Sequence, residues 1–262
     1  MNSSVLFVFV LGVLLGVLRA ADLALGTDAA TGLCVVGSVW WRYLALGIVV
    51  LLVAIVFSRV KLPEIEHVDE VDAEGHKVGL WKHPLFVFGL VALFAYEIGE
   101  ISINSFFINY VVEQGWMNAR DASFVLSFGG LTLFMLGRFA GSWIMRRVRA
   151  EKMLFVCATG TVITTAVVLL DVGYVSLVAL LCGYAFEAIM FPTIFALSLR
   201  GLGSHTKRAS SFLMMSPVGG VVGPLLMGLV ADHSSMVLSF SVPLAAYVVV
   251  WLYARRMVTV AD

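Results

Sequence analysis

The sequence predicts an all-helical membrane protein, and three observations carry that prediction. Hydrophobic residues make up 61% of the 262 residues and charged residues 13%, which is too little charge to cover a water-facing surface. Several apolar runs approach or exceed the roughly 20 residues that a helix needs to cross a bilayer core. The runs are continuous and show no alternation of apolar and polar residues, so they indicate helices and not the strands of a membrane barrel.

The N-terminal third holds two apolar runs and one charged segment. Residues 5–18 are apolar but short, and they form either a short membrane helix or a signal-like segment. No basic residue precedes this run, which favours the helix. Residues 43–57 are predicted to span the bilayer. Residues 59–83 carry a cluster of acidic side chains that cannot lie in lipid, so we expect an extramembrane loop there.

Six further spans follow, joined by short connections. Their approximate limits are 85–111, 123–145, 153–170, 174–199, 209–231 and 237–254. Lysines and arginines favour the cytoplasmic side of a membrane protein. With the charged loop in the cytoplasm, all but four of the 17 lysines and arginines fall on that side; Arg19, Arg42 and Arg120 fall opposite, and Arg138 lies within a span. The C-terminus is therefore expected in the cytoplasm.

The composition argues against several classes of function. The net charge is zero, which gives no reason to expect a nucleic-acid partner. The three cysteines are far apart and the five histidines have no metal-ligand spacing, so we expect neither a disulfide framework nor a metal site. The glycine-rich signature of an ATP-binding loop does not occur in the sequence. The sequence therefore predicts no metal, no cofactor and no nucleic-acid partner.

The span 85–111 carries a polar stripe. At roughly 100° per residue, Glu97, Glu100 and Asn104 fall within an arc of about 60°. A carboxylate at the centre of a lipid-facing helix costs about 2.5–3.5 kcal/mol on insertion scales, so the stripe faces protein or a water-filled cavity. It is either a site for a polar substrate or a proton, which we favour, or a buried network that only fixes packing.

A second stripe lies in the span 174–199. Tyr184, Glu187, Phe191 and Phe195 fall within an arc of about 80°. Pro192 removes a backbone hydrogen bond and is expected to bend the helix. Aromatic faces stack on a pyranose while polar groups fix its hydroxyls, so a bend beside a carboxylate suits a sugar-binding wall. Ordinary helix packing is the alternative for the two phenylalanines.

Small residues and one arginine suggest moving helix contacts. The pairs 137/141 and 219/223 have the G-x-x-x-G spacing, which lets membrane helices approach closely or slide past each other. Arg138 lies near the cytoplasmic end of its span. It either sets topology by reaching the lipid headgroups or acts as a charge lock on one conformation.

At these positions the sequence resembles a known family. The run Tyr-Glu-Ile-Gly-Glu-Ile-Ser at 96–102, continued by Asn109 and Tyr110, resembles the seventh helix of the fucose permease and glucose/galactose transporters of the major facilitator superfamily. Gly-Arg-Phe-Ala-Gly-Ser-Trp at 137–143 is similar to their eighth helix. Motifs from 191 to 220 resemble their tenth and eleventh, and residues 43–65 resemble the sixth helix and the start of the central loop.

The resemblance implies two six-helix halves that rock around a central sugar site with proton coupling. It assigns residues 84–262 to the C-terminal bundle, 59–83 to the central loop, and 1–58 to a remnant of the N-terminal half with one or two helices. Glu100 matches an acidic or amide position of the family, and Phe191 matches an aromatic residue that faces the sugar. Glu97 stands where an apolar residue is expected. The implied partners are a monosaccharide, a proton, the lipid bilayer, and the missing N-terminal half or a second copy.

The sequence thus predicts part of a proton-coupled symporter for a monosaccharide of fucose, glucose or galactose type, in the inner or plasma membrane. A truncated half-transporter, or a membrane subunit that needs a partner, remains the alternative. An enzyme is not expected, since only the neighbouring carboxylates of the first stripe favour one.

The candidate residues form three groups. The residues expected to contact the substrate are Glu100, Asn104, Tyr184, Glu187 and Phe191. Further candidates for the cavity are Tyr96, Glu97, Asn109 and Phe195. The candidates for conformational or gating contacts are Arg138, Gly137, Gly141, Gly219, Gly220 and Gly223.

Overall fold

The computed structural model describes residues 80–261, which form helices and connecting turns with no strand among them. Six segments of this part are long and apolar enough to cross a membrane. Their bounds are Pro84–Glu113, Ala119–Ile144, Ala150–Leu169, Tyr174–Ser198, Thr206–His233 and Met236–Val260. The six predicted spans are therefore confirmed, with ends shifted by only a few residues. The segments 5–18 and 43–57, and the loop 59–83 up to residue 79, lie outside the described residues.

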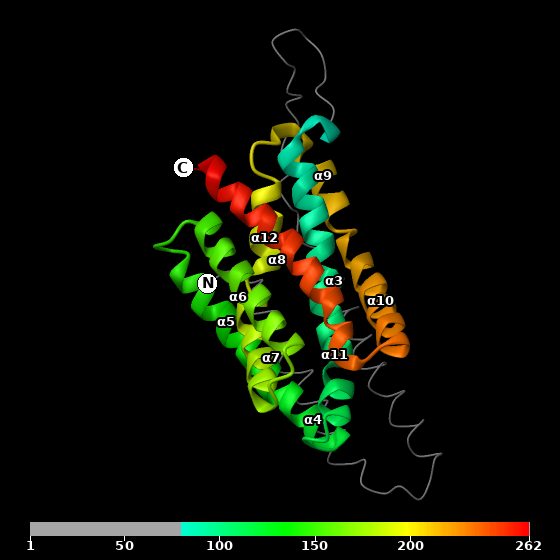
Figure 1. Ribbon diagram of the computed structural model, residues 1–262. Coiled ribbons are helices and arrows are strands. Elements are labelled where there is room, and N and C mark those ends of the chain that lie inside the picture. Colours follow the sequence, from blue (N-terminus) through cyan, green and yellow to red (C-terminus); the bar gives the residue numbers. More distant parts are fainter. Residues whose placement is uncertain (1–79, 262) are drawn as a thin grey trace, which may run out of the picture. The chain divides into compact units, whose positions relative to one another are not determined.

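Helix α3 (Pro84–Glu113) is the core of the bundle, and Figure 1 shows it running through the other helices. Pro84 stands at the first helical position, where its missing N–H costs nothing. The helix then continues for 30 residues without a break, and Gly115 follows its end with a φ of +69°. It packs against α10 (Gly219–His233), α12 (Ser241–Ala261) and α8 (Met190–Ser198).

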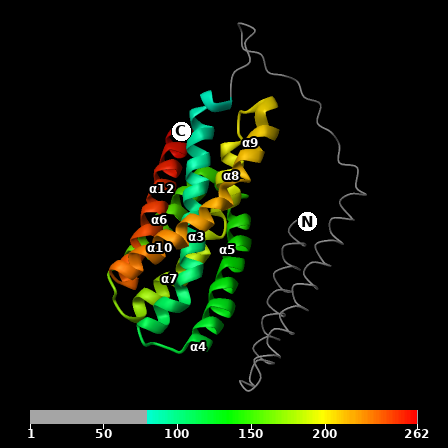
Figure 2. The same ribbon diagram turned by 90° about the vertical axis from the view of Figure 1, so that its right-hand side faces the viewer.

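The remaining helices form the rest of the bundle. Helix α6 (Ala150–Leu169) packs against α12 and against α7 (Tyr174–Glu187), and α5 (Leu131–Ile144) packs against α7. Figure 2, turned by 90°, shows α5 and α12 on opposite sides of α3. Helix α4 (Ala119–Phe124) continues into α5 through the π-helical turn η2 (Val125–Gly130).

The helices differ in how much of them the bundle covers. The apolar core of the segment with α3 is 56% buried, whereas the segment with α4 and α5 is 17% buried and the segment with α9 (Thr206–Leu213) and α10 is 28% buried. Fewer residues of these two segments are therefore covered by the bundle, and the rest of each segment faces lipid or further protein.

Prolines mark the interrupted segments. Pro217 lies in the short turn η4 (Ser216–Val218), which separates α9 from α10, and Pro224 lies within α10. Pro192 lies in α8, directly after the break that separates α7 from α8. The bend expected at Pro192 is confirmed as a break in the helical hydrogen bonding, and a second break lies at Pro217.

Close helix contacts depend on glycines. A Cβ on Gly223 would lie 2.5 Å from the Ile98 carbonyl oxygen, and one on Gly219 would lie 2.6 Å from that of Phe94, so α10 lies directly on the backbone of α3. A Cβ on Gly137 would overlap the Ala185 backbone, which brings α5 equally close to α7. Both G-x-x-x-G pairs thus lie at helix–helix contacts.

The basic residues gather at one end of the bundle. The start of α3, the connection between α8 and α9 and the end of α12 lie together in Figures 1 and 2, away from α4. Of the lysines and arginines in residues 80–261, only Arg120 falls at the end with α4, and Arg138 lies within a span. At the basic end, Arg200 forms an ion pair with Glu151 of the first turn of α6.

Candidate functional site

The candidate site is built around the break between α7 and α8. Helix α7 ends at Glu187 and α8 begins at Met190, with Ile189 between them at φ −106° and ψ −5°. Pro192 explains the break, because its nitrogen has no hydrogen to donate to the carbonyl of Ala188, four residues earlier. The backbone of the span is therefore interrupted inside the membrane. In lipid, freed carbonyls of this kind need another donor.

Two side chains from other helices supply those donors. Arg138 of α5 donates from Nε to the Ala188 carbonyl at 3.0 Å. Tyr96 of α3 donates from its hydroxyl to the Glu187 carbonyl at 3.0 Å. The break is thus held from both sides, by an arginine and by a tyrosine. Arg138 also lies over the ring of Phe134, with its Cζ 5.0 Å from the ring centroid.

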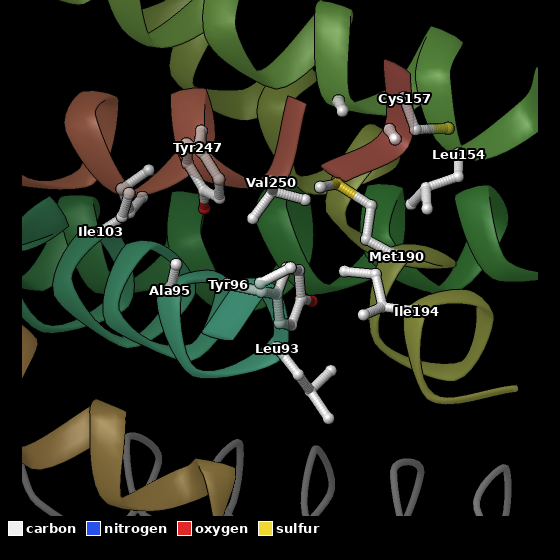
Figure 3. Close-up of a cluster of buried hydrophobic side chains, with 14 of the residues drawn as sticks. Leu93, Ala95, Tyr96, Ile103, Leu154, Cys157, Met190, Ile194, Tyr247 and Val250 are labelled. Atoms are coloured by element: carbon white, nitrogen blue, oxygen red, sulfur yellow. The ribbon is translucent and has the colours of Figure 1, made fainter. Parts of the chain in front are cut away.

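The Glu187 side chain points into the bundle interior. It is 1% exposed, and its Oε1 accepts a hydrogen bond of 2.6 Å from the hydroxyl of Tyr247 in α12. Tyr247 reaches this position because α3 has a glycine beneath it: a Cβ on Gly99 would lie 2.6 Å from the tyrosine ring. Figure 3 shows Tyr96 and Tyr247 entering this core from opposite sides. Helices α3, α7 and α12 therefore meet at one buried carboxyl group.

Glu100 and Asn104 lie one turn apart on α3 and are both half-buried. The Asn104 amide donates to the Glu100 backbone carbonyl at 3.0 Å, which directs it back along its own helix. Glu100 interacts with the Tyr96 hydroxyl and with the charge of Arg138. A carboxylate with some exposed surface, beside a tyrosine and an arginine, is equipped to accept hydrogen bonds from the hydroxyls of a ligand.

Three aromatic rings form a row beside these polar groups. The rings of Tyr96 and Phe191 are 6.2 Å apart, and those of Phe191 and Phe195 are 6.3 Å apart and stacked at 17°. Phe191 and Phe195 are half-buried, so part of each ring is accessible. The row extends the polar site with an apolar face of the type that packs against a sugar ring.

The other candidate residues are more scattered. Glu97 is buried at the contact of α3 with α10, where its Cβ lies 3.3 Å from a Cβ built on Gly219. Asn109 is exposed near the end of α3. Tyr184 is buried one turn before Glu187, packed on Gly130 and Phe107, and its hydroxyl has no hydrogen-bond partner in the described part of the chain.

Three of the six conformational candidates, all on α5, line the same break. Gly137 lies on the Ala185 backbone, and a Cβ on Gly141 would lie 2.5 Å from the Ile189 side chain. Together with Arg138 they place one face of α5 against the end of α7 and the break. Gly219, Gly220 and Gly223 lie on the opposite side of α3, at its contact with α10.

Tyr247 is the site residue that the sequence patterns did not indicate. It lies in an apolar run without other polar groups nearby, so nothing in its own span marks it. A tyrosine that is buried needs a partner for its hydroxyl, and this requirement is the only local signal. The second contact that was missed joins Arg138 to Ala188, although Pro192 indicated which carbonyl would lack a donor.

An apolar cleft lies apart from this site. It has a volume of about 340 Å³ and is lined by Leu90, Val91, Phe94, Phe212, Met215 and Ser216. No charged side chain lines it. Its chemistry does not match a polar ligand, and the polar site remains the candidate.

Comparison with known proteins gives a consistent group of relatives. The model of the family described as Major Facilitator Superfamily matches residues 2–216. The glucose/galactose transporter of Brucella abortus is 31% identical over 235 residues, which cover 88% of this chain and 56% of that protein. A putative glucose/galactose transporter of Helicobacter pylori is 35% identical over 226 residues, covering 84% and 54%. The L-fucose-proton symporter of Escherichia coli is 30% identical over 232 residues, covering 83% and 51%.

A solved structure matches as well. The crystal structure of the transporter FucP in the outward conformation superposes with a TM-score of 0.74 at 28% identity. The match covers 89% of this chain and 59% of that one. The chain thus spans about half the length of the curated relatives it matches.

Proposed function

The chain belongs to the Major Facilitator Superfamily, and from that premise we propose that it is the C-terminal part of a proton-coupled monosaccharide transporter. The substrate would be a sugar of fucose, glucose or galactose type, as the names of the relatives suggest. The sequence resemblance to this family is confirmed, and so is the all-helical membrane fold. The relatives are transporters and symporters, so the expectation that the chain is not an enzyme is also confirmed.

The observation that carries the proposal is the interrupted helix with a half-buried carboxylate and an aromatic row beside it. Transporters commonly form their sites at interrupted helices near the middle of the membrane. In our proposal Glu100 and Asn104 bind sugar hydroxyls, and Phe191 packs against the apolar face of the pyranose. Phe195 extends that face, and Tyr96 interacts with Glu100 and helps to orient it.

The buried candidates have a supporting role in this proposal. Glu187 and Tyr184 are buried in the bundle, so in this proposal they stabilise the residues that line the cavity and do not contact the sugar. Glu97 supports the contact between α3 and α10, and Asn109 lies toward the end of the cavity. The glycine faces on α5 and α10, with Arg138, are proposed as the surfaces along which helices shift during transport.

Transport by alternating access needs two bundles or repeats that move around one site. Residues 84–262 form one bundle in our proposal, residues 59–83 the central loop, and residues 1–58 the end of the preceding half. The second bundle is either the rest of a longer protein or a second copy of this chain. A membrane subunit that requires such a partner is the second candidate function, favoured by the match to about half of each relative.

The chain is a multi-pass membrane protein, and we propose an orientation for it. The end of the bundle rich in lysine and arginine lies in the cytoplasm, as the distribution of positive charge favours. This places the C-terminus in the cytoplasm. The membrane would be the inner membrane of a bacterial cell, by analogy with the bacterial relatives.

Uptake into proteoliposomes tests the proposal. Radiolabelled glucose, galactose and fucose are offered with and without an inward proton gradient, to this chain alone and to any longer protein that contains it. Accumulation of one sugar that depends on the gradient is the expected result for the transport-competent form. No uptake by either form, with folded protein in the membrane, would contradict the proposal. Uptake by the longer form alone would mean that this chain transports only together with a second bundle.

A further inference from the structure

Glu187 differs from the other carboxylates of the site in its surroundings. Its side chain is 1% exposed. Its Oε1 accepts the hydrogen bond from Tyr247, whereas its Oε2 is buried without a hydrogen-bond partner in the described part of the chain. A carboxylate normally uses both oxygens as acceptors, so the unpartnered atom requires an explanation.

The groups around Glu187 do not provide a compensating positive charge. Helix α3 contributes the Tyr96 hydroxyl and the acidic Glu100, α12 contributes Tyr247, and α7 itself contributes Tyr184. Helix α5 contributes Arg138, whose Nε donates to the Ala188 carbonyl, and no ion pair joins it to Glu187 in residues 80–261.

The other helices near Glu187, α6 and α8, add no positively charged side chain beside its carboxyl group. The charged residues of α6 lie in its first turn, and the Cys157 of that helix lies beside Leu154 and Met190 in Figure 3. Helix α8 has no titratable side chain in Met190–Ser198. Apart from Arg138, which bonds the Ala188 carbonyl, the groups named around the carboxyl group are neutral or acidic.

A buried carboxylate without a cation is costly, by several kcal/mol even after relaxation. A neutral carboxylic acid avoids that cost, and its two oxygens are unlike each other. Its carbonyl oxygen accepts a hydrogen bond, while its hydroxyl oxygen carries the proton. In Glu187 the Tyr247 bond on Oε1 suits the carbonyl oxygen of the acid, and a proton on Oε2 leaves one neutral O–H unpaired in place of a buried charge.

We propose that Glu187 is a proton-binding residue of this bundle, which takes up a proton from water on Oε2, the oxygen that the Tyr247 hydroxyl leaves free. The O–H bond that forms on Oε2 is the bond that breaks when the proton returns to water. The role in a transport cycle rests on the proposed function. The proton-binding site itself does not, because it depends only on the contacts within the bundle.

The helix break can couple protonation of Glu187 to a conformational change. Helix α7 ends at Glu187. The side chain of this residue would bind the proton, and its backbone carbonyl accepts the hydrogen bond from Tyr96. Tyr96 also interacts with Glu100, the proposed sugar contact. Uptake or loss of the proton would change the contact of Tyr247 with the carboxyl group, and Tyr96 links the backbone of the same residue to Glu100.

Infrared spectroscopy of the full chain in lipid tests proton binding directly. Spectra taken through a pH titration are expected to contain a carbonyl-stretch band of a protonated carboxyl group that disappears on deprotonation. Glu187→Gln should remove this band. Tyr247→Phe keeps the carboxyl group but removes its donor, and should shift the band to higher frequency.

Glu151→Gln is the matched control, because Glu151 is also buried but is paired with Arg200 at the basic end of the bundle. It should leave the band unchanged. The same carboxyl bands in the wild-type protein and Glu187→Gln, or a band that Tyr247→Phe does not shift, would overturn the proposal.

A transport assay then tests the role in coupling. One pH unit across the membrane corresponds to about a tenfold driving force for a symporter that moves one proton per sugar. In the transport-competent form, Glu187→Gln should lose this roughly tenfold accumulation while it retains sugar exchange between labelled and unlabelled pools. Unchanged accumulation in Glu187→Gln would overturn the coupling role. A wild-type protein without sugar exchange would refute the proposed function and leave the infrared result to decide on proton binding.

Discussion

Arg138 and Ala188 form the contact on which the interrupted helix depends. The Nε of Arg138 donates a hydrogen bond of 3.0 Å to the backbone carbonyl of Ala188. This carbonyl lacks its helical donor because the residue four positions later is Pro192. A charged side chain within a span thus replaces a backbone N–H as the donor. The cost of the unpaired carbonyl and the cost of burying the arginine are each reduced by this one hydrogen bond.

A double-mutant cycle tests this relationship. Arg138→Ala alone leaves the Ala188 carbonyl unsatisfied and should lower the free energy of unfolding by about 1–3 kcal/mol. Pro192→Ala restores an N–H at the correct position, and Pro192 is exposed, so its ring is not needed for packing. In the Pro192→Ala background, Arg138→Ala should therefore cost about 1 kcal/mol less than in the wild type.

The measurement is the free energy of unfolding of the chain in detergent or lipid. Arg147→Ala is the control, because Arg147 lies over the exposed ring of Trp143 and is itself exposed. It should change the stability by less than about 0.5 kcal/mol. Additive effects of Arg138→Ala and Pro192→Ala would show that the arginine does not replace the missing donor.

A glycine pair on one span tests the close helix contacts. A Cβ on Gly137 would overlap the Ala185 backbone, which cannot move without displacing α7. Gly137→Ala should therefore lower the free energy of unfolding by about 1–3 kcal/mol. At Gly129, on the same span, the nearest atom to a Cβ lies 3.7 Å away on Leu181. Gly129→Ala should be neutral or slightly stabilising, and equal losses in both variants would contradict the packing argument.

The spans were predictable because bilayer thickness fixes the length of a continuous apolar run. The break was predictable as well, since Pro192 removes one identifiable hydrogen bond. Helical arithmetic was less successful beyond the break. It placed Glu187, Phe191 and Phe195 on one stripe, but α7 ends at Glu187, and its side chain is buried while the two rings are half-buried.

Contacts between distant segments were not predictable from local patterns. Glu97 and Glu100 are close on a helical wheel, yet Glu97 packs near Gly219 and Glu100 lies near Tyr96 and Arg138. Each side of a central helix such as α3 meets a different neighbour. Likewise, the partner of Glu187 comes from α12, 60 residues later in the chain. Such pairs depend on which helices pack together, and the sequence of a single span does not indicate its neighbours.

The two carboxylates of α3 should differ in sugar binding. Glu100 is half-buried beside Tyr96, so Glu100→Gln removes a charged acceptor from the proposed sugar site. Hydrogen bonds to charged groups contribute about 1.5–3 kcal/mol, so sugar affinity should fall by roughly ten- to a hundredfold. Glu97→Gln changes a side chain at the contact with α10 and should alter affinity by less than about twofold. Sugar titrations of the transport-competent form measure both, and equal effects would contradict the assignment of the site.

Phe191 is the sharpest test of the aromatic wall. Phe191→Ala removes the middle ring of the row that runs from Tyr96 to Phe195, so a bound pyranose would lose its apolar face. An aromatic contact of this kind contributes about 0.5–1.5 kcal/mol beyond its buried area, so affinity should fall by about tenfold. Phe128→Ala is the matched control, because Phe128 also stacks on a second phenylalanine, Phe124, but is 57% exposed on another segment. Both variants lose a stacked ring, but only Phe191→Ala should weaken sugar binding. A loss of affinity in both would mean that the effect arises from general destabilisation, and no loss in Phe191→Ala would place the sugar elsewhere in the bundle.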